Sequence, residues 1–132
     1  MLAARTGECF DVTGPKLAII GSREFIVPNA ILYSRNVIQH YLDLFRPSLV
    51  VSGGATGIDS LAIDVAEHNK IPFIEYLPAS KDWPGYRARN LQIAEECDIM
   101  VCIRCHMATS YGSGWTADRA KEMGKDVRQL WI

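Results

Sequence analysis

Three glycine-rich turns hold most of the residues that could do chemistry in this 132-residue chain. Each turn falls where a predicted strand gives way to a predicted helix. Glycine lets the backbone approach a ligand closely and adopt positive φ, and a helix N-terminus offers unpaired N–H groups with a partial positive charge. A loop that combines the two features is suited to binding anions. The turns are Gly21-Ser22-Arg23, Ser52-Gly53-Gly54-Ala55-Thr56-Gly57-Ile58-Asp59 and Tyr111-Gly112-Ser113-Gly114-Trp115-Thr116.

Polar side chains in the first two turns suit contacts with a phosphate and a sugar. Ser22 can donate a hydrogen bond, and Arg23 offers two parallel N–H donors. Thr56 can cap the following helix or contact phosphate. Asp59 is favourable near a helix N-terminus, and its alternative role is to accept hydrogen bonds from ribose hydroxyls. We therefore expect a pocket for a phosphorylated, nucleotide-like molecule, with tight structural turns as the alternative.

Short apolar runs alternate with amphipathic segments along the chain. Strands are expected at 16–20, 49–51, 72–77, 99–103 and 127–131, and helices at 28–45, 59–69, 86–97 and 115–123. This alternation predicts an α/β fold, a Rossmann-like doubly wound parallel sheet of about five strands with helices on both faces. Ligands bind such sheets beyond the carboxyl ends of the strands, where the strand order switches. All three glycine-rich turns fall at that edge.

Length and composition indicate one globular domain. The chain is long enough to bury a core without metal or disulfide cross-links. Residues 1–14 lack the pattern of a signal peptide and are predicted to be an N-terminal extension, which leaves 15–132 as a single domain. No apolar run reaches the roughly 18 residues of a membrane span, so we expect a cytoplasmic protein without a membrane partner. A net charge of −1 does not favour broad binding to nucleic acid.

The four cysteines do not indicate a metal or haem site. The segment 102–106 matches the C-x-x-C-H pattern of haem attachment, but Cys102 lies in a predicted buried strand. Cys102, Cys105 and His106 lack the further ligand that a zinc site needs. A P-loop lysine pattern is also absent. We therefore expect no metal and no cofactor.

The first two turns resemble those of the SLOG superfamily of Rossmann-like nucleotide-binding proteins, and within it the small YspA/YpsA-related group. The same turns are similar to those of the DNA-processing protein DprA. Arg89-Asn90, Asp98 and the third turn resemble motifs of the LOG phosphoribohydrolases. The resemblance covers roughly residues 16–132 and implies a nucleotide site. The expected ligand-binding residues are Gly21, Ser22, Arg23, Ser52, Gly53, Gly54, Ala55, Thr56, Gly57, Asp59, Arg89, Asn90, Gly112, Ser113, Gly114 and Thr116.

One departure concerns the catalytic carboxylate of the LOG enzymes. Their glutamate stands three residues after the threonine of the third motif, where this chain has Arg119. Asp118 is one position away, which turns it about 100° around a helix. Other carboxylates could substitute, but spacing singles out none of Glu24, Glu75 and Asp82. Enzymatic activity and its catalytic residues therefore stay open.

Three functions follow in order of preference. The first is binding of a phosphorylated nucleotide or nucleotide-derived ligand, such as an ADP-ribose-like molecule or a purine nucleotide. The second is N-glycosidic hydrolysis of nucleoside monophosphates, as in a LOG-like phosphoribohydrolase. The third is DprA-like binding of single-stranded nucleic acid, which the near-neutral charge disfavours.

Aromatic and arginine side chains flank the expected pocket edge. Trp83, Tyr86 and Trp115 could stack on a base, although packing is the commoner role of such residues. Arg87 and Arg89 are two residues apart and cannot share a helix face. By resemblance Arg89 is the one expected to point into the pocket.

An apolar helix face predicts self-association. Ile31, Ile38 and Leu42 can share one face of the first helix. A sheet this small would leave that face uncovered. Together with the family resemblance, this face predicts a homo-oligomer, a dimer or larger.

Overall fold

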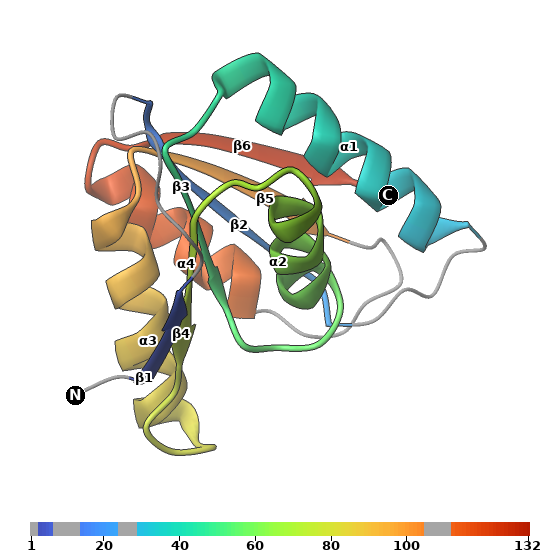
Figure 1. Ribbon diagram of the computed structural model, residues 1–132. Coiled ribbons are helices and arrows are strands. Elements are labelled where there is room, and N and C mark those ends of the chain that lie inside the picture. Colours follow the sequence, from blue (N-terminus) through green and yellow to red (C-terminus); the bar gives the residue numbers. More distant parts are fainter. Residues whose placement is uncertain (1–2, 7–13, 24–28, 105–111) are drawn as a thin grey trace.

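The computed structural model of the chain contains one mixed sheet with helices on both sides (Figure 1). It describes residues 3–6, 14–23, 29–104 and 112–132. The elements are β1 (Ala3–Thr6), β2 (Lys16–Gly21), α1 (Ala30–Phe45), β3 (Leu49–Gly53), α2 (Ile58–His68), β4 (Phe73–Leu77), α3 (Trp83–Glu96), β5 (Ile99–Arg104), α4 (Gly112–Glu122) and β6 (Asp126–Trp131).

The sheet has the strand order β1-β4-β3-β2-β5-β6. The five strands from β2 to β6 run parallel, which confirms the predicted Rossmann-like α/β fold. β2 is central: Leu17 pairs with Val50 on one side and with Ile99 on the other. Leu17, Ala18 and Ile19 are fully buried because helices cover both faces of the sheet. The chain crosses from one side of β2 to the other through α3, so the strand order switches between β2 and β5.

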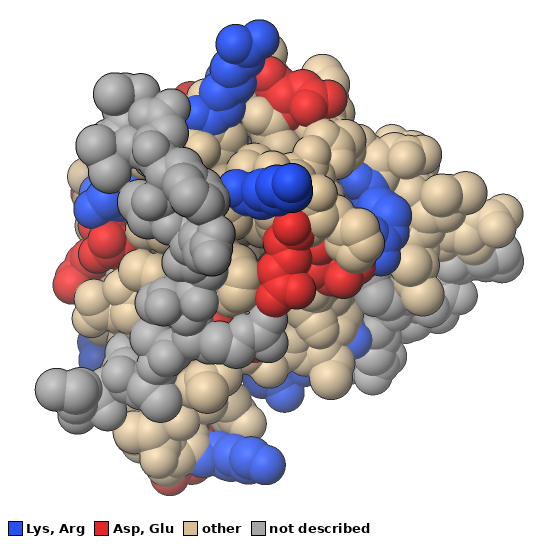
Figure 2. Space-filling model, in the orientation of Figure 1, with Lys and Arg blue, Asp and Glu red and all other residues tan. Residues whose placement is uncertain are grey.

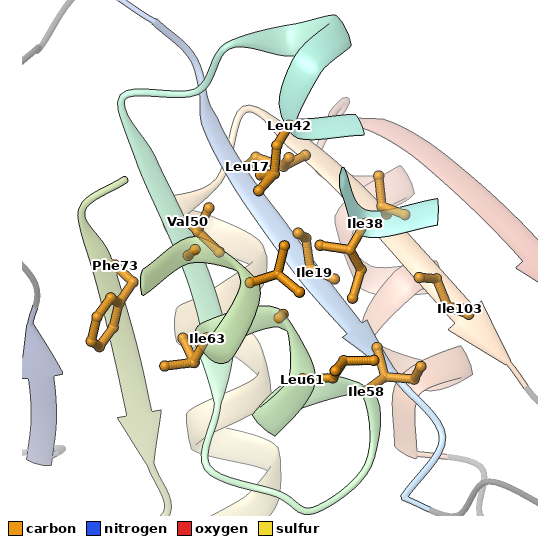
Figure 3. Close-up of a cluster of buried hydrophobic side chains, with 14 residues drawn as sticks. Leu17, Ile19, Ile38, Leu42, Val50, Ile58, Leu61, Ile63, Phe73 and Ile103 are labelled. Carbon is orange, nitrogen blue, oxygen red and sulfur yellow. The ribbon is translucent and has the colours of Figure 1, made fainter. Parts of the chain in front are cut away.

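The two helical layers bury separate apolar clusters. α1 and α2 cover one face, where the side chains in Figure 3 fill the space between these helices and β2, β3 and β5. α3 and α4 cover the opposite face with smaller residues, including Ala94, Ala117 and Ala120. Alanines let the α3–α4 layer lie close to the strands. Because β2 to β6 run parallel, the helices that follow these strands begin at the same edge of the sheet in both layers.

A sixth strand extends the sheet beyond the five expected ones. β1 lies within the segment 1–14 that was predicted to be an extension, and it pairs antiparallel with β4, with Ala3 opposite Leu77. Figure 1 shows β1 beside β4 at the edge of the sheet. A four-residue strand is too short to show a clear alternation of apolar and polar residues, so its sequence carried little signal.

Two helices begin three residues earlier than predicted. α3 begins at Trp83, because the Asp82 carboxylate caps it by accepting a hydrogen bond from the Gly85 amide at 3.0 Å. Pro84 lies in the first turn, where a missing N–H costs nothing. α4 begins at Gly112. The Trp-Pro-Gly segment, expected as a loop, is thus the first turn of α3.

The apolar face expected to drive self-association is mostly interior. Ile38 and Leu42 are buried in the core, whereas Ile31 is 54% exposed. The buried stripe of α1 continues toward its start through Ala30 and Ser34, at spacings of four, so Ile31 lies off the stripe. The prediction that Ile38 and Leu42 form an uncovered surface was wrong.

The face of the molecule that carries α1 and α2 shows basic and acidic side chains next to one another, without a broad region of one sign (Figure 2). Among the residues the structure describes, no helix is both long enough and apolar enough to cross a membrane.

Ile31 and Ile38 give a matched test of how α1 is placed. Ile38→Ala should lower the free energy of unfolding by about 2–5 kcal/mol, because it removes buried methyl groups and leaves a cavity. Ile31→Ala should change it by less than about 0.5 kcal/mol. Urea unfolding followed by circular dichroism measures both. Equal losses in the two variants would contradict this orientation of the helix.

Candidate functional site

Two adjoining cavities open at the carboxyl edge of the strands. The first has a volume of about 270 Å³ and lies where the strand order switches, between the end of β2 and the first turns of α3 and α4. The second, of about 450 Å³, lies beside the β3–α2 loop and the end of β4. Four residues line both cavities and therefore join them: Arg23, Ala55, Tyr86 and Arg89.

Backbone contacts hold the first glycine turn against the second. The Ile58 amide donates to the Ser22 carbonyl at 3.0 Å, and the Gly21 amide donates to Asp59 Oδ1 at 3.3 Å. Gly57 has φ of +82°, and a Cβ at this position would collide with the Ser22 carbonyl oxygen. Only glycine fits both requirements. The two turns thus form one rigid cradle beneath the cavities.

Asp59 lies at the floor of the first cavity with only 6% of its surface exposed. Burial raises the pKa of this carboxyl to about 7, against the opposing effects of the Arg89 guanidinium and of the amides of Gly21 and Gly53. Near neutral pH the group can therefore accept or donate a proton. Such a carboxyl at the bottom of a pocket is typical of a functional site.

Gly53 lets Asp59 and Arg89 lie directly against the backbone. A Cβ at this position would stand 2.6 Å from Arg89 Nη1 and 2.7 Å from Asp59 Oδ2, closer than real contacts allow. Both charged groups therefore occupy the space that a side chain at residue 53 would fill. The glycine at the end of β3 is a condition for bringing them together.

Arg89 projects from α3 and is 4% exposed. Its Nε donates to Asn90 Oδ1 at 2.7 Å, and Nη1 donates to the Tyr76 carbonyl at 3.4 Å. Burial lowers the pKa of the guanidinium, and the Asp59 charge opposes that effect. Arg87 is exposed, so Arg89 is the member of the pair that lines the cavities. A buried arginine held from behind by a carbonyl and an amide is preorganised for binding an anion.

Tyr86 carries two arginines over its ring. The guanidinium carbon of Arg23 lies 5.0 Å from the ring centroid, and that of Arg89 lies 5.8 Å from it. Contacts of this kind stabilise a cation over an aromatic face. Lys81 adds a third basic side chain to the second cavity, and no carboxylate lines that cavity among the described residues. The described side chains therefore give the second cavity a positive electrostatic potential.

The third glycine turn contributes the start of α4. Gly112 and Ser113 line the first cavity. Ser113 Oγ is buried and makes no hydrogen bond within the described part of the chain. Thr116 also lines the cavity, but its hydroxyl donates to the Gly112 carbonyl at 2.9 Å. Within the described residues, Ser113 Oγ is therefore a buried polar atom at this wall that a ligand could pair.

The structure brings together most of the site residues expected from the sequence. Nine of them line the first cavity: Gly21, Arg23, Ala55, Asp59, Arg89, Asn90, Gly112, Ser113 and Thr116. Gly54 and Thr56 line only the second. Five line neither cavity, namely Ser22, Ser52, Gly53, Gly57 and Gly114. Ser52 is turned inward, since its hydroxyl donates to the Ile19 carbonyl at 2.7 Å.

Several lining residues were not expected from the sequence. Ile93 belongs to the first cavity, and its spacing of four from Arg89 on the same helix could have indicated it. Lys81 belongs to the second, together with Leu77 and Pro78. Leu77 is the last residue of β4, and Pro78 and Lys81 follow it. This segment carries no glycine motif, so the sequence offered no signal for the three residues.

The other described carboxylates that were weighed as substitutes for the LOG glutamate do not line either cavity. Asp82 caps α3, and its hydrogen bond with the Ser80 hydroxyl lowers its pKa. Glu75 and Asp118 are likewise absent from both linings, and Glu24 lies outside the described residues. Within the described ranges, Asp59 alone brings a carboxylate to the cavities.

The cysteines that matched a haem or zinc pattern are only partly described. Cys102 is buried in β5, and burial raises the pKa of its thiol to about 11. Cys105, His106 and Cys9 lie outside the described residues, as does Tyr111 of the third turn. No cluster of three potential metal ligands occurs in the part of the chain that the structure covers.

Of the comparisons with known proteins, only the one with solved structures gives a match, and it concerns the fold. No known family model matches the sequence, and no curated protein matches it. The structure is similar to that of DNA processing protein A (DprA) from Streptococcus pneumoniae, with a TM-score of 0.66 and 23% identity. The match covers 88% of this chain and 50% of that protein. The chain therefore shares the Rossmann-like fold of DprA and spans half of its length.

The raised pKa of Asp59 predicts how stability depends on pH. The usual pKa of this carboxyl is 3.8, so between about pH 4 and pH 7 the folded protein keeps a proton that the unfolded chain loses. The contribution of Asp59 to the free energy of unfolding is therefore most favourable below about pH 4. It falls by up to about 4 kcal/mol as the pH rises to about 7. Urea unfolding of the wild type and of Asp59→Asn isolates the effect. The free energy of unfolding of the wild type should fall relative to that of Asp59→Asn as pH rises from about 4 to 7. A wild-type value that stays level or rises relative to the variant would contradict the prediction.

Proposed function

We propose that the chain binds a phosphorylated nucleotide or nucleotide-derived ligand across the two cavities, such as an ADP-ribose-like molecule or a purine nucleotide. The observation that carries this proposal is the pair of arginines, Arg23 and Arg89, that lines both cavities over one tyrosine ring. The two arginines lie at the junction of the cavities. A negatively charged group bound there would contact both the basic second cavity and the polar and aromatic first cavity.

The second cavity suits the phosphate. Arg23, Arg89 and Lys81 line it together with the loop residues Gly54 and Thr56. Guanidinium groups bind phosphate oxygens through paired hydrogen bonds. The exposed Arg23 can turn toward the ligand at little cost, whereas Arg89 is already fixed. In the proposed complex the phosphate occupies this cavity.

The first cavity suits the sugar. Asp59 and Asn90 offer oxygen acceptors for hydroxyl donors, and Ser113 Oγ makes no hydrogen bond to any described residue. Asp59 lies beside Arg89, so a sugar in the first cavity would adjoin a phosphate in the second cavity. We propose further that the chain is a member of the SLOG superfamily, near the YspA/YpsA-related group. The fold shared with DprA and the residues of the first two turns support that placement.

Ligand retention tests the proposal. Purified protein is incubated with AMP, GMP, NAD, ADP-ribose and cyclic nucleotides, then ultrafiltered, and both fractions are analysed by mass spectrometry. Retention of one ligand unchanged is the expected outcome. Failure to retain any of these compounds would overturn the proposal.

Arg23 provides the sharpest variant. Arg23→Ala should weaken binding of the retained ligand about tenfold, because it removes charge-assisted hydrogen bonds to phosphate. Because Arg23 is exposed, its replacement by alanine should not unfold the protein, so weaker binding would reflect the lost contact with the ligand. Arg35→Ala is the matched control: Arg35 is paired with Asp64 at 2.7 Å and lines neither cavity. Isothermal titration should show unchanged affinity for the control, and equal weakening in both variants would count against a phosphate role for Arg23.

N-glycosidic hydrolysis of a nucleoside monophosphate is a second candidate, favoured by Asp59. A carboxyl with a pKa near 7 on a cavity floor can protonate a leaving base or activate water. Free base and ribose phosphate in the filtrate, lost in Asp59→Asn, would establish this activity. Unchanged nucleotide would exclude it for the compounds in the panel.

Single-stranded nucleic acid is a third candidate, favoured by the likeness to DNA processing protein A and by the arginines and aromatic rings around the first cavity. Single-strand binding combines such groups along an extended basic groove. Here the basic groups gather at joined cavities, and the chain has a net charge of −1. Salt-sensitive binding of an oligothymidine that AMP does not displace would support this candidate over a nucleotide site.

A further inference from the structure

Trp83 lines the first cavity and yet is 48% exposed. It is the first residue of α3, directly after the capping Asp82. A large aromatic ring that is half open to solvent has only part of its surface used in packing. Its position at the cavity rim leaves that open part available to a ligand.

The indole is held in place from behind. Trp115, on α4, meets Trp83 edge to face, with ring centroids 5.1 Å apart. Two arginines steady Trp115 in turn: the guanidinium carbon of Arg87 lies 5.9 Å from its centroid, and that of Arg119 lies 5.2 Å from it. Arg119 is itself fixed by two hydrogen bonds of 2.7 Å to Glu122. Trp115 lines neither cavity, so its role here is to position Trp83.

The backbone of Trp83 is equally constrained. The Asp82 carboxylate caps the helix through the Gly85 amide, and Pro84 fixes the next φ. A ring placed in this way loses little conformational freedom when a ligand binds, which favours affinity. The rim residue is thus a preorganised flat surface.

We propose that Trp83 stacks on the nucleobase of the ligand, with Trp115 holding the indole in position. The inference rests on the proposed nucleotide function and adds where the base lies. The phosphate lies between Arg23 and Arg89, the sugar lies at Asp59, and the base extends to the α3 rim. Stacking accepts any base because every base has a flat π-face. Specificity among bases therefore comes from other contacts.

The test compares ligands with and without a base. AMP, ADP-ribose and ribose 5-phosphate are titrated into the wild type, Trp83→Ala and Trp83→Phe. Trp83→Ala should weaken AMP and ADP-ribose about tenfold and leave ribose 5-phosphate within about twofold. Trp83→Phe should restore most of the affinity, because a phenyl ring also stacks.

Trp131 supplies a matched control. It is 49% exposed, and the guanidinium carbon of Arg104 lies 4.3 Å from its ring centroid, but it lines neither cavity. Trp131→Ala should leave all three affinities unchanged. Equal weakening of ribose 5-phosphate and AMP in Trp83→Ala, or no weakening of either, would overturn the stacking role alone. Failure of the wild type to bind any of the three ligands would overturn the nucleotide function itself.

Discussion

The site depends on one buried carboxylate. Asp59 accepts a hydrogen bond from the end of β2 through Gly21, lies over Gly53 at the end of β3 and faces Arg89 from α3. Three elements from different parts of the chain therefore meet at one side chain. Such a group is costly to bury without partners, so the fold supplies amides and a guanidinium around it. Removing any of these partners would disturb the floor of the first cavity as well as its charge.

The distribution of charge divides the site into two parts. Three basic side chains line the second cavity, whereas the first combines Asp59 with amide, hydroxyl and aromatic groups. Arg23 and Arg89 lie at the junction. Because the protein as a whole is close to neutral, this local concentration of positive charge acts at short range. It favours a compact anion over a long polyanion, which needs an extended basic surface.

The sequence predicted the fold well because its signals agreed at several levels. Short β-branched runs, amphipathic helices and glycine turns all indicate the same parallel sheet. The glycine turns also located Asp59, since it lies in the first turn of α2, whose position at the sheet edge is fixed by the topology. Arg89 came from family resemblance, and its burial depends on packing between α3 and the strands that no local pattern reveals. Lys81 was missed for the same reason, because its place in the site is a tertiary property, whereas Ile93 follows Arg89 by one helical turn and could have been inferred once Arg89 was placed.

The same limit explains the error on α1 and the local hydrogen bond of Thr116 in the third turn. Ile31 and Ile38 are seven residues apart and share a face in an ideal helix, but the sheet contacts the stripe that contains Ala30 and Ser34 instead. In the third turn, Thr116 lines the first cavity, and its hydroxyl donates a hydrogen bond to its own helix backbone. Polar residues at helix starts have this local option, and sequence alone does not decide between the two.

The antiparallel pairing of β1 bears on how the domain can be handled. β1 occupies the outer hydrogen-bonding edge of β4, where Ala4 and Arg5 pair with Tyr76 and Glu75. Removing residues 1–14 would leave the backbone groups at the outer edge of β4 unpaired. An open strand edge is a template for pairing with another molecule and a common cause of aggregation. The four residues of β1, which look dispensable in the sequence, thus protect the edge of β4, and a version without them would be expected to aggregate.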